Sequence, residues 1–250
     1  MIRIVEKNNL SVGKIKMKAD YELSDCMCKP LDSFKSGFML IINGPSGSGK
    51  TNMLVNLLNK NKCKLTKKRQ SFKGCFHNIY ICSPSLHTLD NPVFNDLDTK
   101  YDTFDEDFID MYLDTMETQK DEQDDDDEPI LNLLILDDVA DDIKDKTVFK
   151  KFTKLINTRR HCNTSIIILS QNIIQLPPII RKNISHLITF QLKQISEEEH
   201  IYSMTKQPKS LMRGFFDSIF DAPFNFLYID LTLKTGKIQF YKNWNKIAFN

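Results

Sequence analysis

The chain has 250 residues, 41% of them hydrophobic, and a net charge of +1 at pH 7. This length suits one α/β domain with a sizeable core, and the composition excludes an intrinsically disordered protein. No apolar run approaches the ~20 residues of a membrane helix, and the early charges are unlike a signal peptide. The six cysteines are scattered, and the pair Cys26 and Cys28 alone is a poor zinc site. We therefore expect an intracellular protein with reduced thiols.

Acidic and basic residues are segregated along the chain. Residues 90–128 hold 17 acidic and 2 basic residues, so the rest carries 32 basic and 16 acidic residues. Residues 60–73 contain seven basic residues and no acidic one. A basic protein of this kind suits a polyanion partner, because phosphate contacts release counterions. A solvated helix end and loop is the alternative for the basic stretch.

In chain order, residues 1–36 are polar and lysine-rich and indicate an N-terminal arm ahead of a domain spanning 37–250. Hydrophobic periodicity and turn signals predict the later elements. The first are a strand over 38–42, a helix over 52–60 and a strand over 77–82, followed by a short strand and an amphipathic helix within 90–118. A strand over 130–136, a helix over 144–158 and strands over 165–170 and 187–190 come next. The last are a helix opened by a capping box at 196–199 and a C-terminal hairpin within 224–242.

Strands that are apolar on both faces and alternate with helices predict an α/β fold. Its central sheet is expected to be mainly parallel and covered by helices on both sides. The like-charge run 121–128, within an acidic insertion of about 119–129, is typical of a disordered surface loop. A segment that occupies a DNA channel as a mimic is the alternative.

A complete phosphate-binding motif lies between the first predicted strand and helix. Glycines there let backbone N–H groups point at phosphate oxygens, and the helix N-terminus adds positive potential. Lys50 reaches the β- and γ-phosphates, and the Thr51 hydroxyl ligates Mg²⁺. The motif predicts that the chain binds a nucleoside triphosphate. Its residues are Gly44, Pro45, Ser46, Gly47, Ser48, Gly49, Lys50 and Thr51.

Polar residues end two further apolar strands. Asp137 is the natural second Mg²⁺ ligand, of the Walker B type, and Asp138 is placed to polarise a water for attack on the γ-phosphate. Gln171 ends the next strand, which in motor ATPases lies between the strands of the two motifs, and is expected to contact the γ-phosphate or the attacking water. A helix-capping or solvated Asp138 and a buried, capped Gln171 are the alternatives.

Arginines near these strands are candidates for a finger that acts across a subunit interface, because a guanidinium can stabilise transition-state charge. Arg159 and Arg160 precede the strand that ends at Gln171, and Arg181 follows a Pro-Pro pair. Surface charge or DNA contact is the alternative for Arg159 and Arg160. The residues do not rank the three candidates firmly.

Five segments together resemble a known family: the phosphate-binding loop, residues 134–139, residues 160–167, Ser170 with Gln171, and residues 181–186. The ordered set is similar to the poxvirus-type genome-packaging ATPases of the FtsK/HerA superfamily, found in large double-stranded DNA viruses and virophages. The resemblance spans residues 37–190, roughly 60% of the chain. The long acidic segment and the C-terminal hairpin depart from it.

The resemblance implies an ASCE-type, RecA/FtsK-like P-loop NTPase that hydrolyses ATP with Mg²⁺. It implies a homo-oligomeric ring, pentameric or hexameric, that drives double-stranded DNA through a capsid vertex, in the virion or in viral factories of the host cytoplasm. In the family, Lys50 and Thr51 bind phosphate and Mg²⁺, Asp137 and Asp138 are the Walker B pair, Gln171 is the sensor, and Arg160 occupies the arginine position before the sensor strand.

Two other functions compete with a motor. A nucleotide-gated structural protein would bind ATP only to assemble on a capsid vertex; the catalytic pair Asp138 and Gln171 argues against it. A small-molecule kinase would need an arginine-rich lid, and the sequence has no such segment.

Overall fold

In the computed structural model, residue 23 and residues 29–59, 71–85, 91–95, 97, 99–123, 128–205, 207, 209–232 and 237–247 are described. Cys26, Cys28, most of the basic stretch 60–73 and residues 124–127 of the acidic run lie outside the described residues. The predictions made for them therefore stay predictions.

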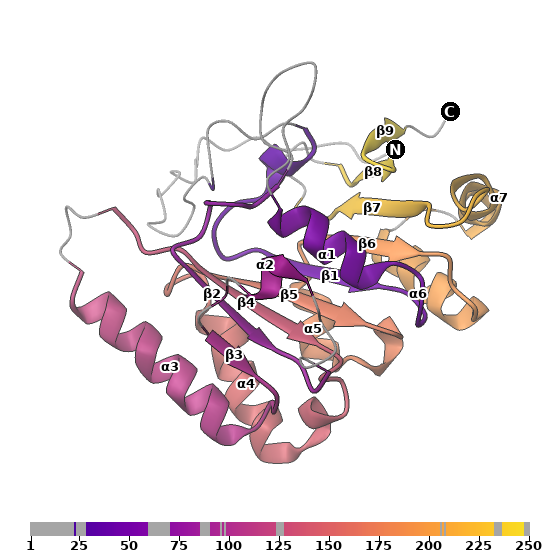
Figure 1. Cartoon of the computed structure of the whole chain (residues 1–250). Helices are drawn as coiled ribbons and strands as arrows, with labels where there is room; N and C mark the ends of the chain where they lie inside the picture. Colours follow the sequence, from indigo (N-terminus) through magenta and orange to yellow (C-terminus); the bar gives the residue numbers. More distant parts are fainter. Residues whose placement is uncertain are drawn as a thin grey trace, which may run out of the picture.

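The described strands form one nine-stranded sheet in the order β3-β2-β4-β5-β1-β6-β7-β8-β9 (Figure 1). The strands from β3 to β6 in this order are parallel to their neighbours, and β7, β8 and β9 are added antiparallel. The prediction of a mainly parallel α/β sheet is confirmed. The strands are β1 (Met39–Asn43), β2 (Asn78–Cys82), β3 (Thr99–Tyr101), β4 (Asn132–Asp137), β5 (Thr164–Ser170), β6 (His186–Phe190), β7 (Phe226–Asp230), β8 (Gln239–Lys242) and β9 (Asn245–Ile247).

Strand β5 lies between β1 and β4, as the sequence analysis expects for a motor ATPase. Met39 of β1 pairs with Ile166, and Asp137 of β4 pairs with Leu169. The backbone N–H of Gly44 also donates to the carbonyl of Ser170 at 3.1 Å. Because all three strands are parallel, their carboxyl ends meet at one edge of the sheet.

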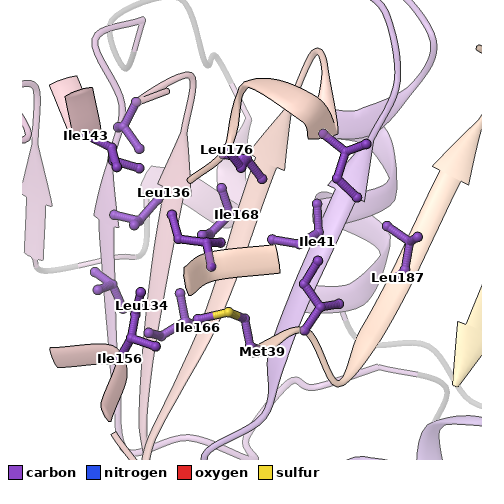
Figure 2. Packing of buried hydrophobic residues seen from close by; sticks show 14 of the residues in the cluster. Met39, Ile41, Leu134, Leu136, Ile143, Ile156, Ile166, Ile168, Leu176 and Leu187 are labelled. Atoms are coloured by element: carbon purple, nitrogen blue, oxygen red, sulfur yellow. The ribbon is translucent and has the colours of Figure 1, made fainter. Parts of the chain in front are cut away.

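Helices cover both faces of the sheet (Figure 1). Helices α1 and α2 share one hydrophobic cluster with one face, and α3 to α7 share a second cluster with the other. Figure 2 shows part of the second cluster, where alternate side chains of β1, β4 and β5 such as Ile41, Leu134 and Ile168 interdigitate. The helices are α1 (Lys50–Leu58), α2 (Pro92–Asn95), α3 (Glu106–Asp121), α4 (Lys146–Thr158), α5 (Pro178–Asn183), α6 (Ile195–Thr205) and α7 (Lys209–Ile219), with 3-10 turns η1 (Leu31–Ser33), η3 (Asp142–Lys144) and η4 (Ile173–Gln175).

The structure corrects the predictions made at the starts of α6 and α5. Helix α6 begins at Ile195, so Ser196 lies in its first turn, and the predicted capping box at 196–199 is wrong. The Pro-Pro pair does not simply break the chain, because Pro178 opens α5. Proline suits this position, since the first N–H groups of a helix have no partner within the helix. Helix α7 and strand β9 are additions that the periodicity does not predict.

The acidic insertion overlaps the end of α3. This helix continues to Asp121, and the side chain of Gln119 accepts a hydrogen bond of 2.9 Å from Asn132 Nδ2 at the start of β4. The predicted C-terminal hairpin is present, since β7 and β8 pair antiparallel. Within the described ranges, no helix is both long and apolar enough to cross a membrane.

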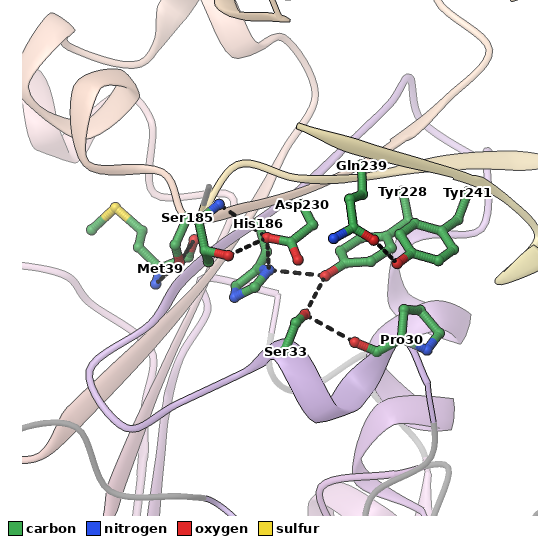
Figure 3. A network of polar contacts seen from close by, with 10 residues as sticks. Pro30, Ser33, Met39, Ser185, His186, Tyr228, Asp230, Gln239 and Tyr241 are labelled. Atoms are coloured by element: carbon green, nitrogen blue, oxygen red, sulfur yellow. Dashed lines mark hydrogen bonds and ion pairs between the residues drawn. The ribbon is translucent and has the colours of Figure 1, made fainter. Parts of the chain in front are cut away.

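Residues 29–36, assigned to the N-terminal arm, pack onto the sheet (Figure 3). The ring of Phe34 stacks on His186 with centroids 3.6 Å apart. The hydroxyl of Tyr228 is 3.0 Å from Ser33 Oγ and 2.9 Å from His186 Nδ1. This buried network fastens η1 to β6 and β7. We retain the division into residues 1–36 and 37–250 as a proposal.

Candidate nucleotide-binding and catalytic site

The phosphate-binding loop connects β1 to α1 in a conformation that requires glycine at two positions. Gly49, at the N-cap of α1, has a left-handed φ of 104°. A Cβ at Gly44 would lie 2.7 Å from Ser48 Oγ and 3.0 Å from the Cβ of Phe190. The loop can therefore curl tightly at the start of the helix, and its backbone N–H groups can surround an anion.

The side chain of Lys50 folds back over this loop. Its Nζ donates to the carbonyl oxygens of Gly44 at 2.7 Å and Pro45 at 3.1 Å. Burial lowers the pKa of Lys50, and the charges of Asp137 and Asp138 oppose that shift. An ammonium that donates to neutral carbonyls in a half-buried loop gains from an anionic ligand.

Another donor of the loop is also available to such a ligand. The hydroxyl of Ser48 is buried and has no hydrogen-bond partner in the described part of the chain. Together with Lys50 and the helix N-terminus, it makes the loop fit a phosphate chain.

Asp137, at the end of β4, lines the same hollow as this loop, although β5 separates β4 from β1. Its Oδ2 accepts a hydrogen bond of 3.2 Å from Ser83 Oγ, which in turn lies 3.1 Å from Ser85 Oγ. Burial raises the pKa of Asp137; Asp138 adds to the shift, while Ser83 and Lys50 oppose it. The sequence analysis missed Ser83. A signal existed, since Ser83 directly follows the second predicted strand, and parallel pairing brings the ends of β2 and β4 together.

Asp138 and Gln171 lie together at the ends of two neighbouring strands. Gln171 Nε2 donates to Asp138 Oδ1 at 3.1 Å, and both side chains are exposed. Asp138 has a left-handed φ of 58°, which ends the strand immediately after Asp137. A non-glycine residue in this region of backbone space is uncommon and marks a local constraint.

One hollow of about 350 Å³ collects these groups. A Thr51 hydroxyl and one carboxylate suit Mg²⁺, which usually takes its remaining ligands from phosphates and water. Within the described ranges, no group of three or more histidine, cysteine, aspartate or glutamate side chains could hold a metal by itself. Ser46, Lys50, Thr51, Asp137, Asp138 and Gln171 line the hollow.

The three arginine candidates have different environments. Arg159 is only 5% exposed; its Nε donates to Gly37 O at 3.1 Å and its Nη1 to Asn183 Oδ1 at 3.2 Å. Burial and the neighbouring Arg160 lower its pKa to about 10. Arg159 therefore holds the turn after α4 in place, and its guanidinium is not presented to another subunit.

Arg160 is exposed at the amino end of β5, a seven-residue strand. At ~3.3 Å per residue, it lies roughly 20 Å from the edge that carries the phosphate-binding loop of its own subunit. Arg181, on α5, has its Nη1 3.1 Å from His200 Nε2 and lines a separate groove of about 480 Å³. The structure leaves both as candidates for a contact across an interface.

A buried carboxyl behind the loop is a further feature that the sequence analysis missed. Glu197 of α6 is 4% exposed. Burial raises its pKa, while the side chain of Asn43 and the backbone of Ile173 lower it. Asn43 ends β1 just before the phosphate-binding loop, and Ile173 begins η4 just after Gln171. Glu197 thus lies between the two segments that carry the site. In sequence it is one of three consecutive glutamates, which gives no signal of burial.

These features define the class: a P-loop NTPase of the ASCE type, with an added strand between the two motif strands and a polar residue at its end. The model of the family described as poxvirus A32 protein matches residues 31–215. The chain belongs to this family, and the resemblance to the poxvirus-type genome-packaging ATPases is confirmed. A search of the curated proteins gives no match.

Solved structures with the same fold include viral and bacterial ATPases. The genome packaging NTPase B204 of Sulfolobus turreted icosahedral virus 2, in complex with sulfate, is 16% identical, covering 84% of this chain and 98% of its own, with a TM-score of 0.57. The DNA-packaging ATPase B204 of Sulfolobus turreted icosahedral virus is 16% identical over 82% and 97%, with a TM-score of 0.55. EssC (ATPases 2 and 3) from Geobacillus thermodenitrificans is 15% identical over 70% and 36%, with a TM-score of 0.50. At these identities the likeness concerns the fold.

Proposed function

We propose that this protein is an ATP-hydrolysing, Mg²⁺-dependent motor that moves double-stranded DNA into a viral capsid. The observation that carries the proposal is the hydrogen bond between Gln171 and Asp138 beside Asp137 and the phosphate-binding loop. Membership of the poxvirus A32 family supports it. So do the names of B204, a genome packaging NTPase and DNA-packaging ATPase with the same fold.

Five side chains of the hollow have roles in the proposed hydrolysis. Lys50 and the backbone N–H groups of the loop would bind the phosphates. Thr51 and Asp137 would hold Mg²⁺, which would supply positive charge to the phosphates. Asp138 accepts the proton of the attacking water. Gln171 positions the Asp138 carboxylate through its amide. Because η4 begins two residues later, a movement of Gln171 when the γ-phosphate is lost would also move η4.

Coupling to DNA rests on charge. Outside residues 90–128 the chain carries 32 basic against 16 acidic residues. Contacts of lysine and arginine with phosphates do not depend on base sequence, and a packaging motor requires such sequence-independent binding. We therefore expect the duplex to be bound through its backbone.

The site calls for a second subunit. Arg160 lies at the sheet edge opposite the phosphate-binding loop, so it can contribute to hydrolysis only in a neighbour's site. A homo-oligomeric ring, pentameric or hexameric, supplies that geometry. The ring would act at a capsid vertex, in the virion or in viral factories of the host cytoplasm.

The experiment is ATP turnover measured with and without duplex DNA, alongside the size of the assembly. We expect turnover that rises with duplex DNA of any sequence and falls as salt weakens DNA binding. The Lys50→Ala protein is the matched control for contaminating ATPases. ATP binding with no turnover, or turnover indifferent to DNA in an assembled ring, would instead favour the nucleotide-gated assembly protein.

A further inference from the structure

Phe224 is held in an unusual position two residues before β7. Its side chain is 68% exposed, and its φ is +63°. Left-handed backbone is unfavourable for a bulky residue and persists only where the surroundings impose it. The exposed ring and the left-handed backbone both cost free energy. Because the ring is exposed, it does not repay that free energy by packing in the hydrophobic core.

The loop that carries Phe224 is tied to the C-terminal strands. Asn243, between β8 and β9, accepts a hydrogen bond of 2.9 Å from Phe226 N and donates one of 2.6 Å to Asn225 Oδ1. Lys242 Nζ lies 2.7 Å from Asp221 Oδ2, and Asn225 Nδ2 donates to the other carboxylate oxygen of Asp221 at 2.6 Å. The terminal hairpin thus acts as a support that fixes the loop.

The fixed ring lies against the phosphate-binding loop. A Cβ built on Gly49 would be 3.5 Å from Phe224 Cδ1 and 3.5 Å from Phe190 Cε1. Phe224 lines the catalytic hollow and also a second hollow of about 360 Å³ on the other flank of the loop. Ser48, Phe190, Gln191, Lys193 and Pro223 are among the residues that line this second hollow.

The strand order decides which end of a nucleotide meets Phe224. Asp137 and Gln171 mark the γ-phosphate end; Asp137 is the last residue of β4, and Gln171 follows β5. On the sheet, β4 and β5 lie on one side of β1, and β6 and β7 lie on the other (Figure 1). A nucleotide whose phosphates occupy the loop after β1 must extend its base away from Asp137. That direction leads to the ends of β6 and β7, where Phe190 and Phe224 lie.

We propose that Phe224 is the stacking platform for the nucleobase, and that the hollow beside it holds the base and ribose. The inference rests on the nucleotide binding in the proposed function and extends it to the nucleoside half. Every base has a π-face, and an aromatic ring stacks on all of them.

The test compares two polyphosphate ligands, of which only one carries a nucleoside: ADP, a diphosphate, and inorganic tripolyphosphate. Binding is measured by calorimetry for the wild type, Phe224→Ala and Phe224→Tyr. We expect Phe224→Ala to weaken ADP binding about tenfold and to leave tripolyphosphate binding unchanged. Phe224→Tyr should retain ADP binding, because it keeps an aromatic ring. Ile195→Ala, which removes another side chain that is 68% exposed, is the matched control and should change neither.

Phe224→Asn provides a second ring-free variant, because asparagine tolerates left-handed backbone better than alanine does. ADP binding that survives in both variants would overturn the inference. An equal loss of ADP and tripolyphosphate would also overturn it, because the ring would then support the loop rather than the base. Failure of the proposed motor, seen as absent DNA-stimulated turnover, leaves this binding comparison intact.

Discussion

The side-chain amide of Gln171 donates a 3.1 Å hydrogen bond to the carboxylate of Asp138, from the end of one strand to the end of its neighbour. In this arrangement the sensor residue and the proposed general base form one unit. A change in either residue should therefore affect hydrolysis more than nucleotide binding.

Asp138→Asn should retain ATP and lose turnover by about 10²–10⁴-fold, the usual contribution of a general base. Mg²⁺ would still have Thr51 and Asp137.

Gln171→Ala should also slow turnover with little change in the Kd for ATP, by misplacing the Asp138 carboxylate. Lys50→Ala should lose both binding and turnover. Single-turnover hydrolysis and calorimetry separate these effects. An Asp138→Asn protein that turns over at nearly the wild-type rate would refute the assignment of the base.

Mixed rings test the arginine. Lys50→Ala subunits, which keep Arg160, should restore turnover when mixed with Arg160→Ala subunits, which keep a working phosphate-binding loop. The rescue should grow with protein concentration and vanish when the ring dissociates. If Arg160→Ala alone hydrolyses ATP normally and Arg181→Ala does not, Arg181 is the finger. If neither change matters, the model of catalysis across the interface fails.

Arg159 serves as the matched structural control for that experiment. Its guanidinium is buried and donates to Gly37 O and Asn183 Oδ1. Arg159→Ala leaves these acceptors without their donor, which typically costs about 1–3 kcal/mol per buried group. We expect a lower melting temperature, and Lys50→Ala subunits should not be able to rescue this defect. Wild-type stability in Arg159→Ala would contradict the structural role.

The buried Glu197 predicts a pH-dependent stability. Burial raises the pKa of its carboxyl above the ordinary value of 4.5. Between these two pKa values the folded state binds more protons than the unfolded state, so the free energy of unfolding falls as pH rises through that window. Glu197→Gln removes this penalty. Thermal melts should show Glu197→Gln more stable than wild type at about pH 8 and similar at about pH 4. If Glu197→Gln is less stable than the wild type at the higher pH, the charged carboxylate of Glu197 stabilises the fold.

The acidic run predicts an effect on DNA retention. Replacing the four aspartates 124–127 by asparagine removes negative charge without shortening the connection between α3 and β4. We expect tighter retention on duplex DNA in a salt gradient and an unchanged melting temperature. Replacing Lys144, Lys146, Lys150 and Lys154 by glutamine is a control of equal size and opposite sign. A large fall in the melting temperature of the asparagine variant would show that the run is structural.

Local signals determined the phosphate-binding loop, the strand that ends at Asp137 and the polar end of β5. Each depends on residues adjacent in the chain: glycines where the backbone must turn tightly, and an apolar run that stops at a carboxylate. The position of β5 between β1 and β4 was expected from the strand order of motor ATPases rather than from hydrophobicity, since every buried strand has a similar composition. The capping box failed because the helix-favouring pattern at 196–199 does not show that α6 starts one residue earlier.

Only the tertiary structure separated Arg159 from Arg160, because adjacent residues with the same side chain differ solely in the direction in which the turn after α4 points them. The same is true of Glu197, buried within a run of glutamates, and of Phe224, a hydrophobic residue that the fold leaves exposed. Sequence patterns report the average environment of a segment. Burial of one charge, or exposure of one ring, depends on contacts with distant segments, such as η4 for the helix of Glu197 and Asn243 for the loop of Phe224. These contacts exist only after the chain has folded.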